Sequence, residues 1–405
     1  MSVVFFESGD TLKQLNRSLI LKEIRKRGPV TKIELANKFD LSFPSAGNII
    51  TELLHADLIK ETGYGESKGG RRPILYGMKW DSVHVIALML GVEEITASVV
   101  NMKGEIPHEV TADADTPVLI EKVYALIDQL LEEKTINRSK IVGIGVSAPG
   151  PIDASNGKIL TPPNLEGVHN LNIQHLLEER YELPTVLEKD ANAFALAEQW
   201  FGNIKSNEDI LYVFNDQGLG GGLVVDSRIH RGFANGAGEI GHMTIDINGP
   251  RCKCGNFGCL ETLGSGIAIQ RRFKEELRRG YPSTLAHEYL HDEKDITIDM
   301  IVQEAKKGDD LSKQILHEAG RNLGLGIANA INLFTPNQIV FGGKVTMLYP
   351  NIIKIVEEVA KQRTFSPYSK EIAFSESEFS HQSNTIGAAA VIQQKLFDNP
   401  EAIIK

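Results

Sequence analysis

The sequence predicts an α/β protein that carries a small, mainly helical domain at its N-terminus. Three observations lead to this prediction. Residues 1–80 contain 13 Lys and Arg but 9 Asp and Glu, a net charge of +4, although the whole 405-residue chain has a net charge of −10. The same residues place apolar side chains at helical spacing, ahead of two short strand-like segments. From about residue 83 onward, apolar segments of strand length alternate with amphipathic helical patterns, as is typical of α/β proteins.

The composition excludes several classes of protein. Hydrophobic residues make up 42% of the chain and charged residues 24%, so the chain can bury a large core and is not disordered. The longest apolar segments, such as residues 85–90, are far shorter than the roughly 20 residues of a membrane helix. The N-terminal stretch MSVVFFESGD lacks the basic and apolar regions of an export signal. We therefore expect a cytoplasmic protein that does not cross a membrane.

The first 60 residues predict three helices. Residues 11–26 form an amphipathic pattern that ends at the Gly-Pro pair 28–29. Four apolar side chains share one stripe of this helix: Leu12, Leu15, Leu19 and Ile24. Thr31 and Glu34 have the spacing of a capping box, which predicts that a second, short helix begins there. Ser42 is a typical N-cap residue for a third helix.

The third helix has two different faces. Its apolar residues are expected to point inward: Ile49, Ile50, Leu53 and Leu54. Small polar side chains lie on the other side: Ser45, Asn48 and Thr51, next to the cap Ser42. Two short helices joined by a tight turn, the second opening with small polar residues, match a helix-turn-helix that reads the major groove of double-stranded DNA.

Residues 58–78 are typical of a wing that follows such a motif. Two strand-like pieces flank a Gly-rich, basic tip with Lys68, Arg71 and Arg72. We expect these cations to contact DNA phosphates or a minor groove. The alternative is a three-helix dimerisation bundle with a solvated basic loop. The combination of two helices, a turn and a wing favours DNA binding.

The stretch GHMTIDINGPRCKCGNFGCLET, residues 241–262, contains all three cysteines of the chain. His242, Cys252, Cys254 and Cys259 supply four ligands in the pattern H-x9-C-x-C-x4-C, the number that a closed tetrahedral zinc site requires. Because four protein ligands leave no position open for water, we expect a structural zinc and not a catalytic one. The alternative is three reduced, buried cysteines beside a core histidine.

Several motifs together resemble the ROK family, whose name stands for repressor, open reading frame and kinase. The motifs are GAGEIGHMTID, CKCGNFGCLET, VSAPGPID, PPNLEG, EKDANAFALAE and NQIVFGG. The resemblance implies a two-lobed sugar kinase fold of the actin/hexokinase-like, or ribonuclease H-like, type, with the sugar between the lobes. The repressor branch of the family adds an N-terminal winged helix-turn-helix.

The resemblance also implies a division of the chain into domains. Residues 1–80 are expected to form the winged helix-turn-helix. Residues 81–195 are expected to form the first α/β lobe, completed by the C-terminal helix at about 381–405. Residues 196–380 are expected to form the second lobe, with the zinc loop and a dimerisation surface.

Both phosphate loops of the kinase members are altered in this chain. The first loop, D-x-G-G-T in the kinases, reads MLGVE, with Met89, Val92 and Glu93 at the departing positions. The second, G-T-G-x-G-G-G, reads DQGLGGG, with Asp216 and Gln217 departing. A glutamate in place of a phosphate-binding residue repels phosphates, and Val92 removes a permissive glycine. These changes argue against ATP binding.

The sugar half of the site is closer to the family pattern. The residues that resemble sugar contacts are Ser147, Asn164, Asp190, Glu239, His242 and Glu261. In a kinase, Asp190 would be the base that deprotonates the attacked hydroxyl. Lys189 stands where the family usually has asparagine. This lysine either turns away or contacts an anionic ligand, so a sugar and a sugar phosphate both remain open as effectors.

These observations predict a sugar-responsive transcriptional regulator, most simply a repressor. Sugar would close the cleft and change the spacing of two winged helices in a homodimer, or in a dimer of dimers, on a double-stranded DNA operator. Two alternatives remain open: an active, ATP-dependent ROK sugar kinase with a DNA-binding head, and a protein that binds sugar and partners without DNA.

Overall fold

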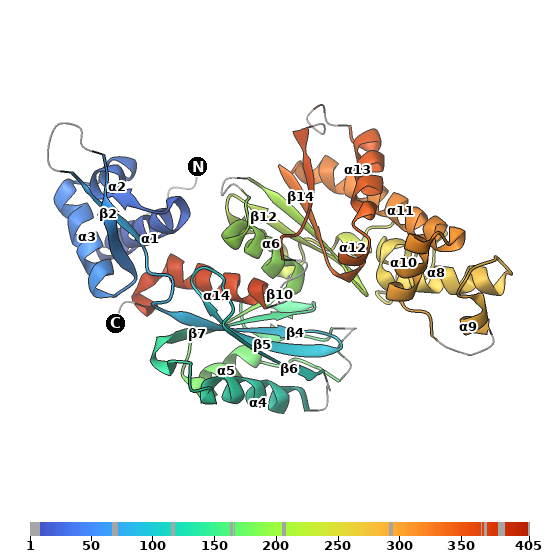
Figure 1. Ribbon diagram of the computed structural model, residues 1–405, viewed down its shortest axis with the longest axis horizontal. Helices are drawn as coiled ribbons and strands as arrows, with labels where there is room; N and C mark the ends of the chain where they lie inside the picture. The colour runs from blue at the N-terminus through green and yellow to red at the C-terminus, as the bar shows by residue number, and fades with distance from the viewer. Residues whose placement is uncertain are drawn as a thin grey trace.

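A computed structural model describes the chain in three parts, which Figure 1 shows as a head at one end and two α/β lobes. The described residues are 9–66, 72–114, 118–162, 165, 167–204, 208–290, 295–365, 367, 371–379 and 385–403. The mixed α/β class that the sequence predicts is confirmed. None of the helices in these ranges combines the length and apolar composition that crossing a bilayer requires.

The head consists of helices packed on a small antiparallel sheet. Its helices are α1 (Gly9–Arg27), α2 (Lys32–Lys38) and α3 (Phe43–His55). Its strands follow the order β1 (Val30–Thr31), β3 (Ile74–Met78) and β2 (Ile59–Tyr64). The Thr31 side chain accepts a hydrogen bond from Glu34 N and the Glu34 carboxylate accepts one from Thr31 N, which confirms the capping box. Ser42 caps α3, also as the sequence predicts.

The apolar stripe that the sequence predicts on α1 is partly wrong. Leu12 and Leu15 are 49% and 39% exposed, whereas Ile20, Leu21 and Ile24 are fully buried. The first turns of α1 extend beyond the core of the head, and its buried residues lie in the second half of the helix. The helical spacing of the apolar residues did not show how far along α1 the core of the head extends.

The first lobe contains a five-stranded sheet with the order β10-β7-β4-β5-β6. These strands are β4 (His84–Leu90), β5 (Glu94–Asn101), β6 (His108–Asp113), β7 (Ile141–Ala148) and β10 (Thr185–Lys189). Strands β4, β7 and β10 are parallel, and β4, β5 and β6 form an antiparallel meander. Helices α4 (Leu119–Glu132) and α5 (Ile173–Tyr181) cover one face. A short hairpin, β8 (Ile152–Asp153) with β9 (Lys158–Ile159), projects beside it.

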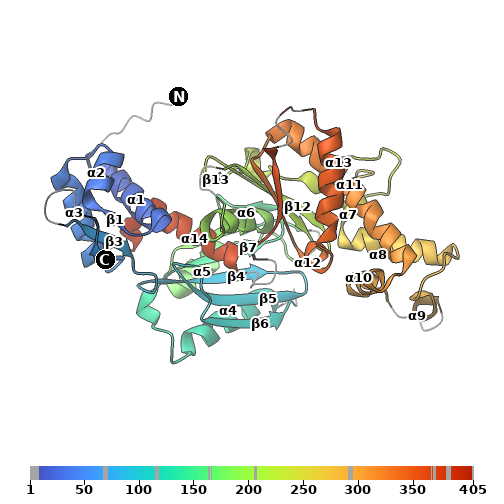
Figure 2. The same ribbon diagram turned by 45° about the horizontal axis from the view of Figure 1, so that its top comes forward.

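The second lobe repeats this plan around the sheet β13-β12-β11-β14-β15. These strands are β11 (Ile210–Asn215), β12 (Leu219–Val225), β13 (Arg228–Ile229), β14 (Gln338–Gly342) and β15 (Ala373–Glu376). The helices on the side away from the head (Figure 2) are α7 (Glu261–Gly264), α8 (Gly266–Arg278), α9 (Ala286–Leu290), α10 (Ile298–Lys307), α11 (Asp310–Phe334), α12 (Lys344–Leu348) and α13 (Asn351–Arg363).

Two helices lie between the sheets and connect the lobes. They are α6 (Asp190–Phe201) and α14 (Ile386–Asp398), and they pack against each other. Glycines allow the close approach: a Cβ on Gly222 of β12 would lie 2.0 Å from Ala191 O of α6, and a Cβ on Gly145 of β7 would lie 2.0 Å from Ala388 O of α14. The expected division after residue 195 falls within α6, which continues to Phe201.

Candidate ligand cavity and metal site

A cavity of about 840 Å³ lies between the two lobes. The first lobe contributes the turn after β4, with Glu93, and the end of β10, with Lys189. The second lobe contributes the turn between β11 and β12, with Asp216, and the segment from Glu239 to Glu261. These side chains lie at the ends of strands and in the connecting turns and loops, which together form the cavity wall.

The cavity contains most of the residues that resemble sugar contacts. Its walls include Lys189, Asp190, Glu239, His242 and Glu261.

Ser147 is not among the lining residues. Its side chain is fully buried, and its hydroxyl has no hydrogen-bond partner within the described part of the chain. Strand alternation places it on the same face of β7 as Gly145, toward α14, and the sequence motif did not reveal that burial. Asn164 lies outside the described residues.

Lys189 is already paired within the protein. Its Nζ lies 3.0 Å from Glu239 Oε1 and donates to Ala237 O at 3.0 Å. The lysine side chain is 8% exposed, and the glutamate side chain is 47% exposed. The sequence left open a lysine that turns away and a lysine that offers its cation to an anionic ligand, and in the structure the ammonium is paired within the protein. The cation instead holds the loop that carries Glu239.

Asp190 is the first residue of α6 and faces the cavity. Its Oδ1 accepts a hydrogen bond from Ala191 N at 2.6 Å. Burial raises the pKa of this carboxyl to about 6, although the Ala191 hydrogen bond and the Lys189 charge act in the opposite direction. At neutral pH the group is therefore mainly a carboxylate, which accepts hydrogen bonds from hydroxyls.

Two further residues support the cavity, and the sequence reasoning missed both. Glu188 is fully buried, and its Oε2 accepts a hydrogen bond from Arg231 Nε at 2.8 Å. Its Oε1 accepts hydrogen bonds from Asn192 Nδ2 and from the backbone N of Lys189. This pair ties β10 to the loop that carries Ala237. The sequence signal that could have identified Glu188 was its position as an acidic residue directly before Lys189 and Asp190.

The cavity wall also includes residues of the two segments that are expected to correspond to the phosphate loops of the kinases, and a hydrogen bond joins these segments. Gln217 Nε2 donates to Glu93 Oε1, which connects the two lobes. Asp216 Oδ2 accepts a hydrogen bond from Lys344 N at 3.4 Å. The Lys344 ammonium lies 2.8 Å from Asp299 Oδ2, and this hydrogen bond raises the pKa of the lysine. Acidic side chains and an interlobe contact therefore occupy this region.

The four expected metal ligands come together at one edge of the cavity. One atom from each of His242, Cys252, Cys254 and Cys259 lies within 4.8 Å of the others. The distance from His242 Nδ1 to Cys252 Sγ is 3.7 Å, and Cys254 Sγ lies 3.7 Å from Cys259 Sγ. Tetrahedral zinc with bonds of about 2.3 Å to sulfur places its ligand sulfurs about 3.8 Å apart. The donor set and its spacing therefore fit zinc.

A metal ion at this cluster would have to displace thiol protons. Burial, followed by hydrogen bonds with the neighbouring thiols of Cys254 and Cys252, raises the pKa of Cys259 to about 12. A metal ion that stabilises thiolates would release protons from this site on binding. Gly258, with φ of 62°, makes the turn between the ligands, and a Cβ there would lie 1.5 Å from Asp246 O. Only glycine fits at this position.

Glu261 links the metal ligands to the cavity. Its Oε1 lies 3.9 Å from Cys252 Sγ, and its Oε2 accepts a hydrogen bond from Leu219 N at 3.2 Å. His242 and Cys254 belong to the cavity wall as well as to the cluster. The candidate metal site and the cavity wall therefore share residues.

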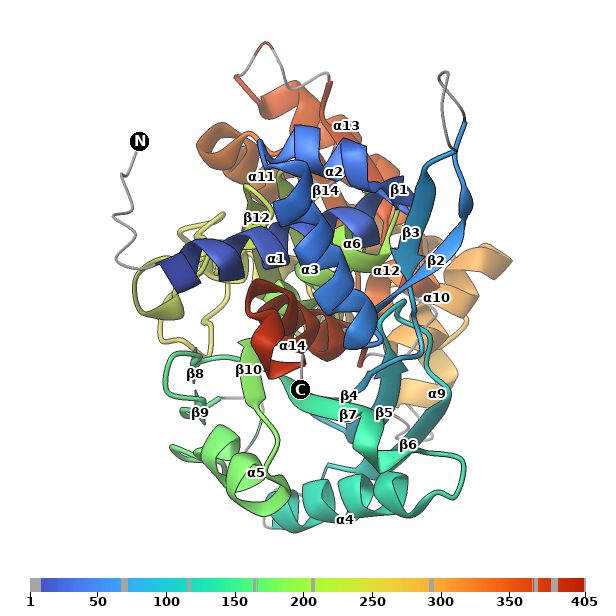
Figure 3. The ribbon, with the colours of Figure 1, turned by 90° about the vertical axis from the view of Figure 1, so that its left-hand side faces the viewer.

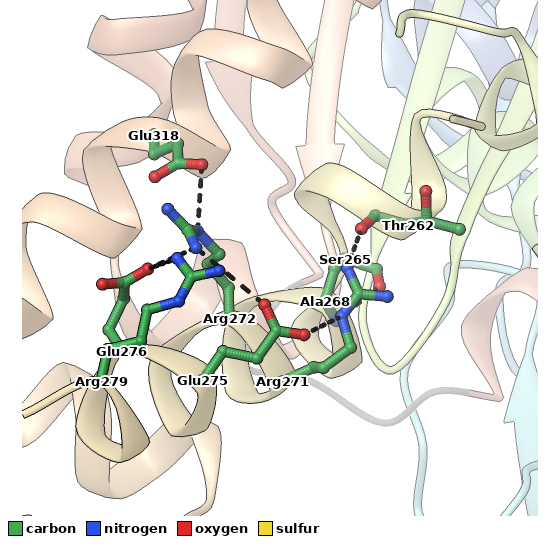
Figure 4. A network of polar contacts seen from close by, with 9 residues as sticks. All are labelled: Thr262, Ser265, Ala268, Arg271, Arg272, Glu275, Glu276, Arg279 and Glu318. Carbon is green, nitrogen blue, oxygen red and sulfur yellow. Dashed lines mark hydrogen bonds and ion pairs between the residues drawn. The ribbon is translucent and has the colours of Figure 1, made fainter. Parts of the chain in front are cut away.

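Polar contacts in the helical layer fix the segment that follows Glu261 (Figure 4). Arg271 of α8 donates to Thr262 O of α7 at 2.7 Å. Arg272, also on α8, forms an ion pair with Glu318 of α11 at 3.4 Å. The first contact attaches the short helix α7, which begins at Glu261, to α8, and the second attaches α8 to α11.

The polar face of α3 is exposed. Ser42, Ser45 and Asn48 all face solvent, and Ser42 Oγ accepts a hydrogen bond from Ser45 N at 3.2 Å. Thr51 is exposed too, but its Oγ1 donates to Gly47 O at 2.9 Å. Arg72 is exposed at the start of the segment that leads into β3. Lys68 and Arg71 lie outside the described residues.

The chain is similar to bacterial repressors over nearly its whole length. The xylose repressor of Caldicellulosiruptor bescii is 31% identical over 394 residues, which cover 96% of this chain and 98% of the relative. The DNA-binding transcriptional dual regulator NagC of Escherichia coli is 31% identical over 392 residues, which cover 96% of this chain and 95% of NagC.

Two solved structures of ROK family proteins are also similar to this chain. A crystal structure of a ROK family transcriptional regulator, a homolog of the E. coli MLC protein, matches with a TM-score of 0.85 and 28% identity, over 97% of this chain and 99% of that chain. A ROK family glucokinase from Streptomyces griseus, in complex with glucose and AMPPNP, matches with a TM-score of 0.67 and 25% identity, over 77% of this chain and 99% of that chain. The model of the ROK family matches residues 85–395. The chain therefore belongs to the ROK family.

Proposed function

We propose that this protein is a sugar-responsive transcriptional repressor that binds double-stranded operator DNA through its head. The observation that carries the proposal is the extent of the similarity. The xylose repressor and NagC align with 96% of the chain, including the head, whereas the glucokinase aligns with 77%. The family model begins only at residue 85, after the head. The head therefore lies outside the region that the family model covers, and this chain has it in common with the two regulators.

In this proposal the head is a winged helix-turn-helix. Helices α2 and α3 form the helix-turn-helix, and the hairpin β2-β3 forms the wing. Ser45 and Asn48, on the exposed face of α3, read base edges, and Ser42 contacts the backbone. Thr51 contributes less because its hydroxyl already donates to Gly47 O. Three wing cations contact phosphates or a minor groove: Lys68, Arg71 and Arg72.

The cavity binds the effector, and its charge favours an uncharged sugar over a sugar phosphate. Of the three lysines in the wall, Lys189 already pairs with Glu239 and Lys344 with Asp299, which leaves Lys253 outside an ion pair among the described residues. Carboxylates dominate the wall: Glu93, Glu94, Asp190, Asp216, Glu239 and Glu261. Carboxylates accept hydrogen bonds from sugar hydroxyls and repel phosphate. An uncharged sugar therefore suits this cavity better.

A zinc ion, held by His242, Cys252, Cys254 and Cys259, would supply a fixed geometry for the loop and no chemistry. All four coordination positions are taken by protein ligands, so no water or substrate position remains. The ion would hold His242 at the cavity wall and restrain the segment that leads to Glu261. The sugar affinity of the protein would then depend on the metal.

The second candidate function is sugar kinase activity, and one observation favours it. Asp190, whose pKa burial raises to about 6, is suited to act as a general base in the cavity. Against it, the Gln217–Glu93 contact and the carboxylate of Asp216 lie in the altered phosphate loops. We therefore propose that the protein binds sugar without phosphorylating it.

Symmetric DNA half-sites call for a homodimer, or a dimer of dimers, with a two-fold axis. We propose the expected division into residues 1–80, 81–195 with 381–405, and 196–380, with the second boundary moved to the end of α6. A cytoplasmic location remains a prediction.

The proposed function is tested with two measurements on the full chain. A thermal-shift panel compares D-xylose, N-acetylglucosamine and glucose with N-acetylglucosamine 6-phosphate and glucose 6-phosphate. Fluorescence anisotropy then measures affinity for a duplex that the protein selects from a randomised pool. We expect an uncharged sugar to raise the unfolding temperature and to weaken duplex binding at least fivefold. A protein that selects no duplex, or whose duplex affinity no sugar changes, would contradict the proposal.

A further inference from the structure

Helix α6 connects the ligand cavity with the contact surface of the head. Its first residue, Asp190, lines the cavity, and Trp200, one residue before its end, contacts the head. A helix of this length spans about 18 Å. One element of secondary structure therefore reaches both sites.

Helix α6 is closely packed on two sides. Every residue from Ala191 to Gln199 is buried. Phe194 stacks on Phe214 of β11, with ring centroids 5.2 Å apart. On the opposite side, a Cβ on Gly387 of α14 would lie 3.0 Å from Ala193. Closely packed interiors transmit displacements because they contain no free volume to absorb them.

The head holds the C-terminal end of α6 through one arginine of α1. Arg25 Nη2 donates to Trp200 O at 2.6 Å, and the Arg25 guanidinium lies 3.9 Å from the centroid of the Trp200 ring. Burial lowers the pKa of Arg25 to about 9, so the side chain stays charged at neutral pH. A cation at the C-terminal end of a helix is favourable because the helix dipole is negative there.

The same helix α1 also holds the C-terminal end of α14. Ser18 Oγ donates to Phe397 O at 2.7 Å, and Lys22 forms an ion pair with Asp398. Trp200 O and Phe397 O are both among the last four carbonyls of their helices, which have no partner within the helix. Figure 3 shows α1 lying across the end of α14, beside α6.

The two helices differ in the sheet that each mainly contacts. Helix α14 packs on strands β4, β7 and β10 of the first sheet, whereas α6 packs mainly on strands β11 and β12 of the second, with fewer contacts to β10 and β7 of the first. A change in the angle between the lobes in which α6 follows the second sheet would therefore shift the end of α6 relative to the end of α14, and α1 contacts both ends.

We propose that α1 senses the position of α6 relative to α14, and that sugar binding in the cavity reaches the head through the ends of these two helices. The inference rests on the proposed function, because it names the route by which sugar changes DNA affinity. The Arg25–Trp200 contact is the sensing contact. Its loss should uncouple the two sites without abolishing binding at either of them.

Trp200 is a natural probe of this contact, because the chain contains two tryptophans and the other is Trp80. In the variant Trp80→Phe, fluorescence reports on Trp200 alone. We titrate this variant with D-xylose and with N-acetylglucosamine, and record emission and acrylamide quenching. A sugar that raises the unfolding temperature should shift Trp200 emission to longer wavelength and increase its quenching. A stabilising sugar that leaves both unchanged would overturn the inference but not the proposed function.

The variant Arg25→Gln tests coupling directly, with Arg27→Gln as the matched control. Arg27 lies on the same helix, is 50% exposed, and pairs only with Glu23 among the contacts of the described residues. We expect sugar to weaken duplex binding at least fivefold in the wild type and in Arg27→Gln, and less than twofold in Arg25→Gln, with unchanged sugar affinity. By reciprocity, duplex DNA should lower sugar affinity by the same factor.

The outcomes separate the two levels of the proposal. An unchanged coupling factor in Arg25→Gln would refute the role of the contact. If the wild type shows no sugar effect on DNA, the proposed function itself fails. If Arg25→Gln does not fold, the fluorescence of Trp80→Phe decides, since that variant keeps the contact intact.

Discussion

The buried pair Glu188–Arg231 should contribute strongly to the stability of the cavity wall. Glu188 is fully buried, whereas the Arg231 side chain is 40% exposed. The change Arg231→Gln removes the charge and leaves a buried carboxylate with hydrogen bonds from Asn192 and the Lys189 backbone only. The loop that carries Ala237 then loses its ion pair with Glu188 and keeps only its contacts with Lys189 at the end of β10.

The expected cost follows from this geometry. Breaking a fully buried ion pair costs about 3–5 kcal/mol. Arg231 is partly hydrated and Glu188 keeps two other donors, so we expect about 2 kcal/mol. With a urea dependence of about 3 kcal/mol per molar, this loss lowers the urea midpoint by about 0.7 M. We also expect sugar affinity to fall about tenfold, because the loop that carries Glu239 is displaced.

The assay is urea unfolding followed by circular dichroism, with Arg228→Gln as the matched control. Arg228 is exposed on the neighbouring strand β13 and should change stability by less than about 0.5 kcal/mol. The double variant Glu188→Gln, Arg231→Gln should be more stable than the sum of the single effects implies, by about 1 kcal/mol or more. A loss in Arg231→Gln no larger than in Arg228→Gln, with additive double-variant effects, would refute the reasoning.

Four further predictions concern the metal, the chemistry, the DNA and the pH dependence. Purified protein should contain about one zinc per chain by elemental analysis, and Cys254→Ser should lose zinc and sugar binding while the head keeps its helical signal; metal-free fresh protein would contradict this. Coupled-enzyme assays should detect no sugar-dependent ADP production, and a rate above background that Asp190→Asn abolishes would favour the kinase. In anisotropy titrations at several salt concentrations, Asn48→Ala should reduce the difference in binding free energy between selected and random duplexes by about 1–3 kcal/mol. Arg72→Ala should weaken binding to both duplexes and reduce the dependence of log affinity on log salt concentration by about one unit. The reverse pattern would make the wing the sequence reader. Burial raises the pKa of Asp190 from 3.8 to about 6, so between pH 3.8 and pH 6 the folded state binds more protons than the unfolded state. This residue therefore lowers the free energy of unfolding as the pH rises from about 4 to 6. Asp190→Asn should flatten the pH dependence of the urea midpoint between pH 4 and 6 and should stabilise the protein at pH 7 by about 1–3 kcal/mol, and an unchanged slope would contradict the assignment.

Local patterns in the sequence predicted the parts of the structure that depend on near neighbours. The capping box of Thr31 and Glu34 needs residues three positions apart, and the structure confirms it. The three cysteines lie within eight positions of one another, so one loop brings them together with His242. The α/β class follows from the spacing of apolar residues, which can be recognised within each strand and helix separately.

The tertiary structure decided which of these residues meet distant partners. Leu12 and Leu15 fit a helical stripe but extend past the core, and Ser147 fits a sugar motif but is buried toward α14. Arg25 and Trp200 are 175 residues apart, and their contact depends on how the head packs against two lobes. The sequence by itself determined the elements, the cluster of candidate metal ligands and the family motifs, because short-range geometry specifies them. Only the packing decided that Lys189 pairs with Glu239 and that α6 reaches the head, because these contacts form between elements that are distant in the sequence and pack together.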